Sequence, residues 1–278
     1  MKSHILNNQY IKNFYDILMI PAIRILPGSL AFFIFMSIVP MITLVASICA
    51  KFSLSTVDLT NFFSTILPHG VEELLLTIFV GADSNMSFWT IILGFVLASN
   101  GPHSIILASN TLYDIKNKNY LNRRIKALFL TIIIMFLFLF ILLVLAFGNI
   151  IIKFILGLEI FSGVAKTIYK LFVILKWPFA IIIIFFLIKV LYTIAPDSRI
   201  PSKYTNRGAL FSTVGLIIST AIYAYYANNI ANYSYIYGNL ANIIILMMLV
   251  YFIAYILVVG IAINANNYKF ENIDNKKK

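Results

Sequence analysis

Six long stretches of apolar residues constrain this chain more than any other feature of its sequence. They lie at about 27–51, 86–112, 127–152, 172–195, 208–229 and 239–264. Each is long enough for a membrane-spanning α-helix, which needs about 20 mostly apolar residues. The runs are continuous rather than alternating, which argues against a closed β-barrel. With 61% hydrophobic and 11% charged residues, the composition also excludes a soluble enzyme and a disordered chain. The sequence predicts an all-α membrane protein, a bundle of six transmembrane helices.

The remaining residues predict a simple domain organisation. Residues 1–26 form a cytoplasmic or interfacial N-terminal segment, 27–264 the six-helix transmembrane domain, and 265–278 a basic cytoplasmic tail. Apolar residues at near-helical spacing, mixed with polar ones, predict short interfacial helices at 5–20 and 71–80.

Lysine and arginine are distributed unevenly between the alternate loops of this six-span arrangement. Fifteen lie on the side that holds both termini and the loops 113–126 and 196–207, and five lie on the other side. Because cytoplasmic loops carry the excess of positive charge, both termini are predicted to be cytoplasmic. The net charge of +11 therefore indicates topology and membrane lipid rather than nucleic acid, which is not expected as a partner. Predicted contacts with anionic headgroups are Arg123, Arg124, Lys126, Lys203 and Arg207.

The second stretch carries the clearest polar cluster within a predicted span: Asn100, Gly101, Pro102 and His103 lie near its midpoint. Proline removes a backbone hydrogen bond, so a kink or break is predicted there. Broken helices at this depth bind substrates in many transporters. A kink that serves packing alone is the alternative, and the sequence does not decide between the two. Pro40 predicts a second kink, in span one, and Asn110 and Tyr113 extend the candidate path of span two.

Several residue types needed for catalysis are missing from the predicted spans. None of the six contains Asp or Glu, which disfavours a proton-driven pump. The three histidines are far apart and Cys49 is the single cysteine, so no metal-ligand spacing occurs. There is also no phosphate-binding Gly-Lys-Ser/Thr loop. We therefore expect no catalytic residues, no metal and no cofactor, and the chain is not expected to be an enzyme.

Several motifs, taken in order along residues 25–265, resemble those of one protein family. They are Ser29-Leu-Ala-Phe-Phe with Met-Ser37-Ile-Val-Pro40, Ala108-Ser-Asn110-Thr-Leu-Tyr113, Tyr192-x-x-x-Pro196-x-x-Arg199-Ile-Pro201, Gly208-Ala, Tyr233-x-x-x-Tyr237-Gly238, and Gly260 with Asn264. Together they are similar to the YihY/BrkB family of bacterial inner-membrane proteins. The resemblance implies six spans, cytoplasmic termini and a bacterial inner-membrane location.

Two positions depart from the pattern of that family. Leu249 stands where the family often has Trp, and Gly260-Ile261-Ala262 stands where it often has Gly-Ala-Glu, so no role of that carboxylate carries over. Some members are labelled ribonuclease BN and others serum-resistance virulence factors. The resemblance therefore implies an architecture rather than an activity.

Three hypotheses for the function follow from the sequence. The first is transport, or the handling of lipids and other envelope components, with the polar second span as a headgroup path. The second is a non-transporting envelope scaffold or virulence factor, whose protein partners and oligomeric state the sequence does not specify. The least favoured is a ribonuclease. A cavity open to one leaflet and lined by Asn100, His103 and Asn110 would favour the first hypothesis, and a solidly packed bundle would favour the second.

Overall fold

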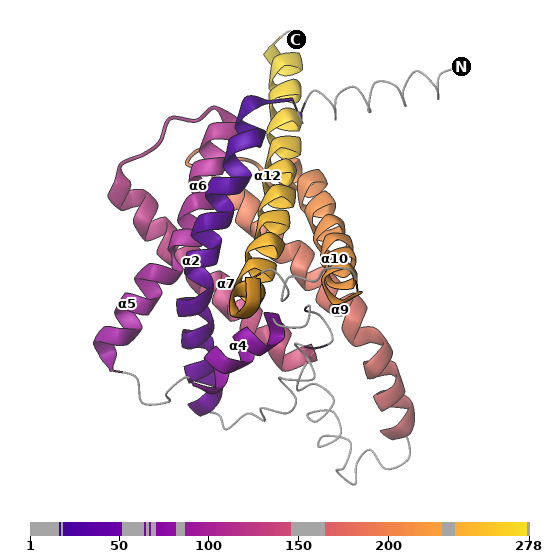
Figure 1. Ribbon diagram of the computed structural model, residues 1–278. Coiled ribbons are helices and arrows are strands. Elements are labelled where there is room, and N and C mark those ends of the chain that lie inside the picture. The colour runs from indigo at the N-terminus through magenta and orange to yellow at the C-terminus, as the bar shows by residue number, and fades with distance from the viewer. Residues whose placement is uncertain are drawn as a thin grey trace.

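Helices make up all the regular secondary structure in the described part of the chain (Figure 1). The computed structural model describes residues 17, 19–51, 64, 67, 71–81, 87–145, 165–229 and 237–276. No strand occurs among these residues, in agreement with the predicted all-α class. Five helical segments are long and apolar enough to cross a membrane, namely residues 21–51, 88–113, 167–194, 202–229 and 241–269.

The first long helix, α2 (Pro21–Lys51), continues without interruption through Pro27 and Pro40. The hydroxyl of Ser37 donates to the Phe33 carbonyl at 2.7 Å, and the hydroxyl of Thr43 donates to the carbonyl of Val39 at 2.8 Å. Such bonds satisfy polar groups within the helix, as an apolar environment requires. Helix α2 is thus continuous at Pro40, where the sequence predicted a kink.

A short helix, α4 (Val71–Val80), confirms the helix predicted at 71–80 and packs against α2. The other predicted short helix, at 5–20, lies outside the described residues except for Ile17, Met19 and Ile20.

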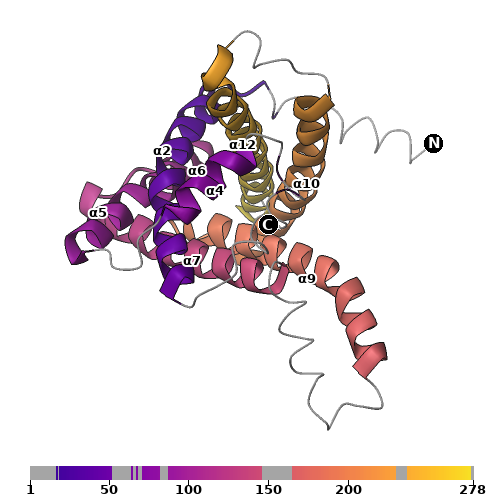
Figure 2. The ribbon, with the colours of Figure 1, turned by 60° about the horizontal axis from the view of Figure 1, so that its bottom comes forward.

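The second predicted span forms two helices, α5 (Phe88–Ala98) and α6 (Asn100–Tyr113). Figures 1 and 2 show α5 leaning outward from the bundle while α6 lies along α2. Helix α6 ends at Asp114, whose φ of 58° is in the left-handed region common at helix C-termini. Residues 115–119 then lead into α7 (Tyr120–Leu145), which crosses behind α6 and α2 in Figure 1.

The second half of the chain forms α9 (Ala165–Ile194), the short η2 (Ser202–Thr205), α10 (Asn206–Asn229), η3 (Gly238–Leu240) and α12 (Ala241–Lys276). Helix α12 packs against α2, α6 and α10 and so occupies the centre of the arrangement (Figure 2). Gly238 has a φ of 54°, which explains a glycine at the turn into η3.

Large apolar side chains cover the outside of this bundle. Trp89 on α5, Phe136 on α7 and Ile222 on α10 are 72%, 67% and 64% exposed. A water-soluble protein does not expose so many large apolar groups, whereas a lipid bilayer solvates them. The core lies instead where the helices meet, around residues such as Val45 and Ala254, both 0% exposed.

The observed boundaries differ from the predicted ones at both ends of the transmembrane domain. Helix α2 begins at Pro21, six residues before the predicted span, and α12 continues past residue 264 to Lys276. Hydropathy alone did not locate these ends because the helical backbone continues into more polar sequence. The predicted span 127–152 falls on α7 up to Leu145, and residues 146–152 lie outside the described part.

At one end of the bundle, α6 and α9 end and α7 and α10 begin (top of Figure 1). We call it the basic end, because of the cationic residues there: Lys116, Lys118, Arg123, Arg199, Lys203 and Arg207.

Candidate functional site

The break in the second span is stabilised by α2. Ser99 separates α5 from α6, and the N–H of Gly101 donates to the Ser37 hydroxyl oxygen at 2.7 Å instead of to a carbonyl of its own helix. Pro102 lies in the first turn of α6, where its missing N–H costs no intrahelical bond. A side chain of α2 thus replaces the hydrogen bond that the break removes.

Arg124 of α7 binds the other side of the same break. Its Nη2 donates to the Val96 carbonyl at 2.7 Å, and its Nη1 donates to Oδ1 of Asn100 at 2.9 Å. The C-terminus of a helix carries partial negative charge, so a guanidinium at the end of α5 is favourable there. The sequence predicted a polar kink and a separate basic segment, and the structure joins the two into one site.

His103 and Arg123 lie beside this contact. The His103 ring packs edge-on against Tyr120, with ring centroids 5.8 Å apart. The positive charges of Arg124 and Arg123 act on that ring. His103 Nε2 and Arg123 Nε are both buried, and neither has a hydrogen-bond partner among the described residues. The hydrogen-bonding capacity of these two nitrogen atoms is therefore unsatisfied within the described structure.

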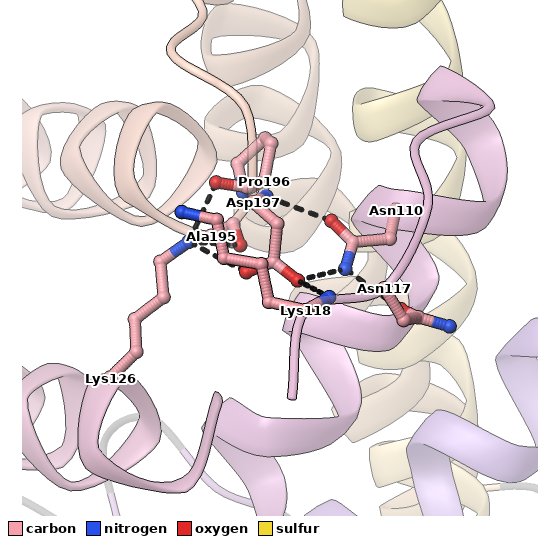
Figure 3. A network of polar contacts seen from close by, with 7 residues as sticks. All are labelled: Asn110, Asn117, Lys118, Lys126, Ala195, Pro196 and Asp197. Carbon is pink, nitrogen blue, oxygen red and sulfur yellow. Dashed lines mark hydrogen bonds and ion pairs between the residues drawn. The ribbon is translucent and has the colours of Figure 1, made fainter. Parts of the chain in front are cut away.

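A network of hydrogen bonds and one ion pair surrounds Asp197 at the basic end (Figure 3). Asp197 accepts hydrogen bonds at Oδ2 from Nδ2 of Asn110, at 2.7 Å, and from the backbone N–H of Lys118, at 3.1 Å. In return its own N–H donates to Oδ1 of Asn110 at 2.8 Å. The Nδ2 of Asn110 also donates a hydrogen bond to Oδ1 of Asn117 at 2.9 Å. The network therefore joins α6 and the turn after it to the turn after α9.

Lys126 of α7 adds the counter-charge to this network. Its ammonium lies 3.3 Å from Oδ1 of Asp197 and donates to the carbonyls of Ala195, at 3.0 Å, and Pro196, at 2.6 Å. Burial by itself raises the pKa of Asp197. The hydrogen bonds from Lys118 and Asn110 and the charge of Lys126 outweigh burial and hold that pKa below its ordinary value. Asp197 is therefore ionised at neutral pH.

Helices α10 and α12 meet through backbone at Gly208 and Gly260. A Cβ on Gly208 would overlap the Gly260 carbonyl oxygen, and one on Gly260 would overlap the Ser212 hydroxyl. The N–H of Gly208 donates to Oδ1 of Asn264 at 2.7 Å. The Tyr192 hydroxyl lies 2.6 Å from that of Ser212 and reaches the Leu257 carbonyl at 2.9 Å. The motif residues Gly208, Gly260 and Asn264 therefore allow close contact between α10 and α12.

A cavity of about 240 Å³ lies beside the break, between α2, α6, α7, α9, α10 and α12. Gly101 and Pro102 line it, together with apolar residues such as Ile34, Met41, Ile134, Ile188, Leu216 and Leu257. Its hydroxyl-bearing residues, Ser37 and Thr131, both donate to carbonyls of their own helices. An apolar cavity of about 150 Å³ in another protein stays dry and accepts benzene. This larger cavity therefore suits an apolar guest.

The cavity does not have the lining that the sequence led us to expect of a headgroup path. Asn100, His103 and Asn110 are not among its lining residues. Asn100 is bound by Arg124, and Asn110 is held by Asp197. Asn100 and His103 instead contact α7, and Asn110 contacts the turn after α9.

Arg124 and Lys126, two of the residues predicted to contact headgroups, both also form hydrogen bonds within the protein. Of the other predicted residues, Tyr113 is buried, with its ring 6.0 Å from that of Tyr268. Arg207 donates to Asn267 at 3.2 Å, and the Lys203 ammonium lies 4.5 Å from the Tyr204 ring. Three more lie exposed on the surface, namely Arg199, Pro201 and Tyr237.

Asp197 is a site residue that sequence reasoning missed, and Ser37 was quoted within a family motif but given no role. Neither belongs to a recognisable polar cluster, because Asp197 lies in a basic turn and Ser37 in an apolar span. One signal was available: Asp197 is the single carboxylate of the loop 196–207.

The helical architecture and the apolar exterior define a multi-pass α-helical membrane protein. The family model for virulence factor BrkB matches residues 23–278, and the chain belongs to that family. It is similar to YfkH of Bacillus subtilis, named a ribonuclease-like protein, with 27% identity over 247 residues, 87% of this chain and 89% of that protein. A UPF0761 membrane protein of Alteromonas mediterranea is 27% identical over 236 residues, 82% of this chain and 77% of the relative. No solved structure matches the chain.

Proposed function

We propose that this chain is a lipid-handling protein of the bacterial inner membrane, which receives a lipid acyl chain in the apolar cavity beside the broken span. The observation that carries the proposal is the cavity itself, about 240 Å³ and lined almost wholly by apolar side chains. Lipid acyl chains are the abundant apolar molecules at that depth of a bilayer. The sequence suggested a path for a headgroup, and the apolar lining favours the tail instead.

The break beside the cavity supports this role. Helices α5 and α6 are separate helices that meet at Ser99. Backbone bonds from Ser99 to Phe95 and from His103 to Ser99 continue through the break, and the side chains of Ser37 and Arg124 supply further bonds there. Side-chain bonds can exchange more readily than the backbone bonds of an intact helix. Movement of α5 about Ser99 is therefore a route by which an acyl chain enters or leaves.

The test is leaflet exchange in vesicles that contain the purified protein and a fluorescent phospholipid. Leu216→Phe places a larger side chain in the cavity, and we expect it to reduce the exchange rate several-fold. Leu210→Phe is the matched control, on the same helix but 59% exposed and outside the cavity lining, and it should behave as the wild type. Exchange no faster than in protein-free vesicles would refute the proposal and favour the scaffold hypothesis.

We propose further that α7 supplies a sixth span and that the basic end faces the cytoplasm, with both chain termini on that side. The bias of fifteen cationic residues to five supports this orientation. Cysteines introduced on a Cys49→Ser background at 116–122 and 199–205 should react only with reagent on the cytoplasmic side. Those at 60–70 and 232–236 should react only from outside. The opposite labelling pattern would overturn the orientation.

The name of the Bacillus relative keeps a ribonuclease as the competing function. No group of three His, Cys, Asp or Glu side chains that could hold a metal ion occurs among the residues described. We propose that the chain does not act as a ribonuclease. RNA cleavage by the purified protein in the presence of Mg²⁺, Mn²⁺ or Zn²⁺ would contradict it.

A further inference from the structure

We propose that His103, Arg123 and Arg124 form a binding site for a phosphate group, the anionic headgroup of the lipid whose acyl chain enters the cavity. The inference rests on the proposed function and specifies the lipid class that the same site selects. It also replaces the broader expectation that every basic cluster of this end contacts headgroups.

The first argument is that these three side chains keep unused hydrogen-bond donors. Arg123 Nε and His103 Nε2 are buried without a partner, as described above. An unsatisfied buried polar atom is costly, and the Nε of Arg123 is always a donor, so this site favours a ligand that accepts hydrogen bonds. Arg124 donates once from Nη1 and once from Nη2, which leaves three of the five guanidinium donors.

The second argument concerns charge. Two guanidinium groups act on the same histidine, and the one carboxylate that also acts on it is Asp197. Asp197 is already bound by Lys126, Asn110 and Lys118. The excess positive charge is therefore not neutralised by a carboxylate of the described chain. A phosphate supplies both the negative charge and several acceptor oxygens, which guanidinium groups bind in pairs.

The third argument is the position of this cluster relative to the cavity. Pro102, which lines the cavity, is next to His103 in α6. On α7, Thr131 lines the cavity and lies seven residues after Arg124, about 10 Å along the helix axis. A lipid with its phosphate at Arg123 and Arg124 would therefore extend its acyl chain toward the cavity.

The experiment measures lipid retained by the full-length protein, by native mass spectrometry after extraction from phosphatidylglycerol or phosphatidylcholine vesicles. We expect the wild type to retain phosphatidylglycerol in preference to phosphatidylcholine. Arg123→Gln and His103→Gln should each weaken that retention about tenfold, the effect of one lost bond to a charged group. Arg199→Gln is the matched control, because Arg199 is an exposed arginine of the same end, and it should change nothing.

A second arm separates a lipid headgroup from free phosphate. If inorganic phosphate raises the unfolding temperature of the wild type but not that of Arg123→Gln, the site takes the free ion. Retention of phosphatidylglycerol without that stabilisation identifies the lipid. Equal retention of the two lipids by the wild type would overturn the proposal without any variant, even if the variants fold poorly.

The results also separate this site from the proposed function. Preferential retention of phosphatidylglycerol without leaflet exchange would support the phosphate site and refute the lipid-handling role. Leaflet exchange without any preference for phosphatidylglycerol would support the role and refute the site.

Discussion

Gly208→Ala is expected to destabilise the protein by about 3 kcal/mol or more, at the upper end of the cost of overpacking. The reason is that the added Cβ would overlap the carbonyl oxygen of Gly260, which belongs to the backbone of α12 and cannot rotate away. The two helices must then separate, and Asn264 loses its bond to the Gly208 N–H. Cys49 is a single buried thiol, so its reaction with a fluorescent maleimide during heating reports unfolding.

Gly28→Ala is the matched control for this prediction. Gly28 lies within α2, and a Cβ there would meet nothing within 4 Å. Alanine favours a helix over glycine by about 1 kcal/mol, so this variant should be as stable as the wild type or more so. Equal stability of Gly28→Ala and Gly208→Ala would contradict the close helix contact.

Gly260→Ala, at the same crossing of α10 and α12, separates destabilisation by side-chain overlap from destabilisation by backbone overlap. Its Cβ would overlap side-chain atoms, namely the hydroxyls of Ser212 and Tyr192, and would lie 3.0 Å from the backbone oxygen of Gly208. Addition of Ser212→Ala should therefore restore part of the lost stability. The same addition should not rescue Gly208→Ala, whose obstacle is a backbone atom.

Asp197→Ala is the second change for which we expect a large effect, a loss of about 3 kcal/mol of stability. Asp197 has a side chain that is 2% exposed, and its removal leaves Lys126, Asn110 and the Lys118 N–H without their acceptor. The estimate stays at the lower end for a broken buried pair, because Lys126 is 23% exposed and keeps two carbonyl partners. Asp114→Asn is the control, since Asp114 is an exposed carboxylate at the same end and asparagine tolerates its left-handed backbone conformation.

The pH dependence gives an independent measure of this effect. The pKa of Asp197 is lowered in the folded protein, so its stabilisation is fully present above the unfolded pKa of about 3.9 and is lost as the pH falls through the folded value. The difference in unfolding temperature between the wild type and Asp197→Asn should be constant from about pH 5 to 8 and shrink below pH 4. A difference that disappears near pH 6 would show that another group titrates. A double-mutant cycle with Lys126→Met should give a coupling of more than about 0.5 kcal/mol.

Much of the fold could be predicted because the bilayer imposes it on the sequence. A chain in hydrocarbon must satisfy its backbone polar groups internally, so each long apolar run had to form a helix. The helix at 71–80 and the interruption in the second span followed from local sequence in the same way. The helix ends at Pro21 and Lys276 did not, because hydropathy marks the part of a helix that is apolar rather than the helix itself.

The candidate site was less predictable, because it depends on partners distant in sequence. Asn100 and Arg124 are 24 residues apart, and Asn110 and Asp197 are 87 apart. The sequence analysis named Asn100, Arg124 and Asn110 as separate candidates and did not name Asp197. From the sequence, each of these side chains could have faced lipid, solvent or another helix. Contacts of this range depend on how α6, α7 and α9 pack.

By itself, the sequence determined a helical membrane protein with a polar break in its second span and a basic end, because hydropathy, helix-breaking residues and charge act locally. Only the tertiary structure decided that Arg124 and Ser37 hold the break, that Lys126 and Asp197 form a pair, and that the cavity beside Pro102 is apolar. The physical reason is that a side chain's role depends on which helix face it meets. That is fixed by the close contact of backbones at positions such as Gly208 and Gly260, and no local pattern encodes it.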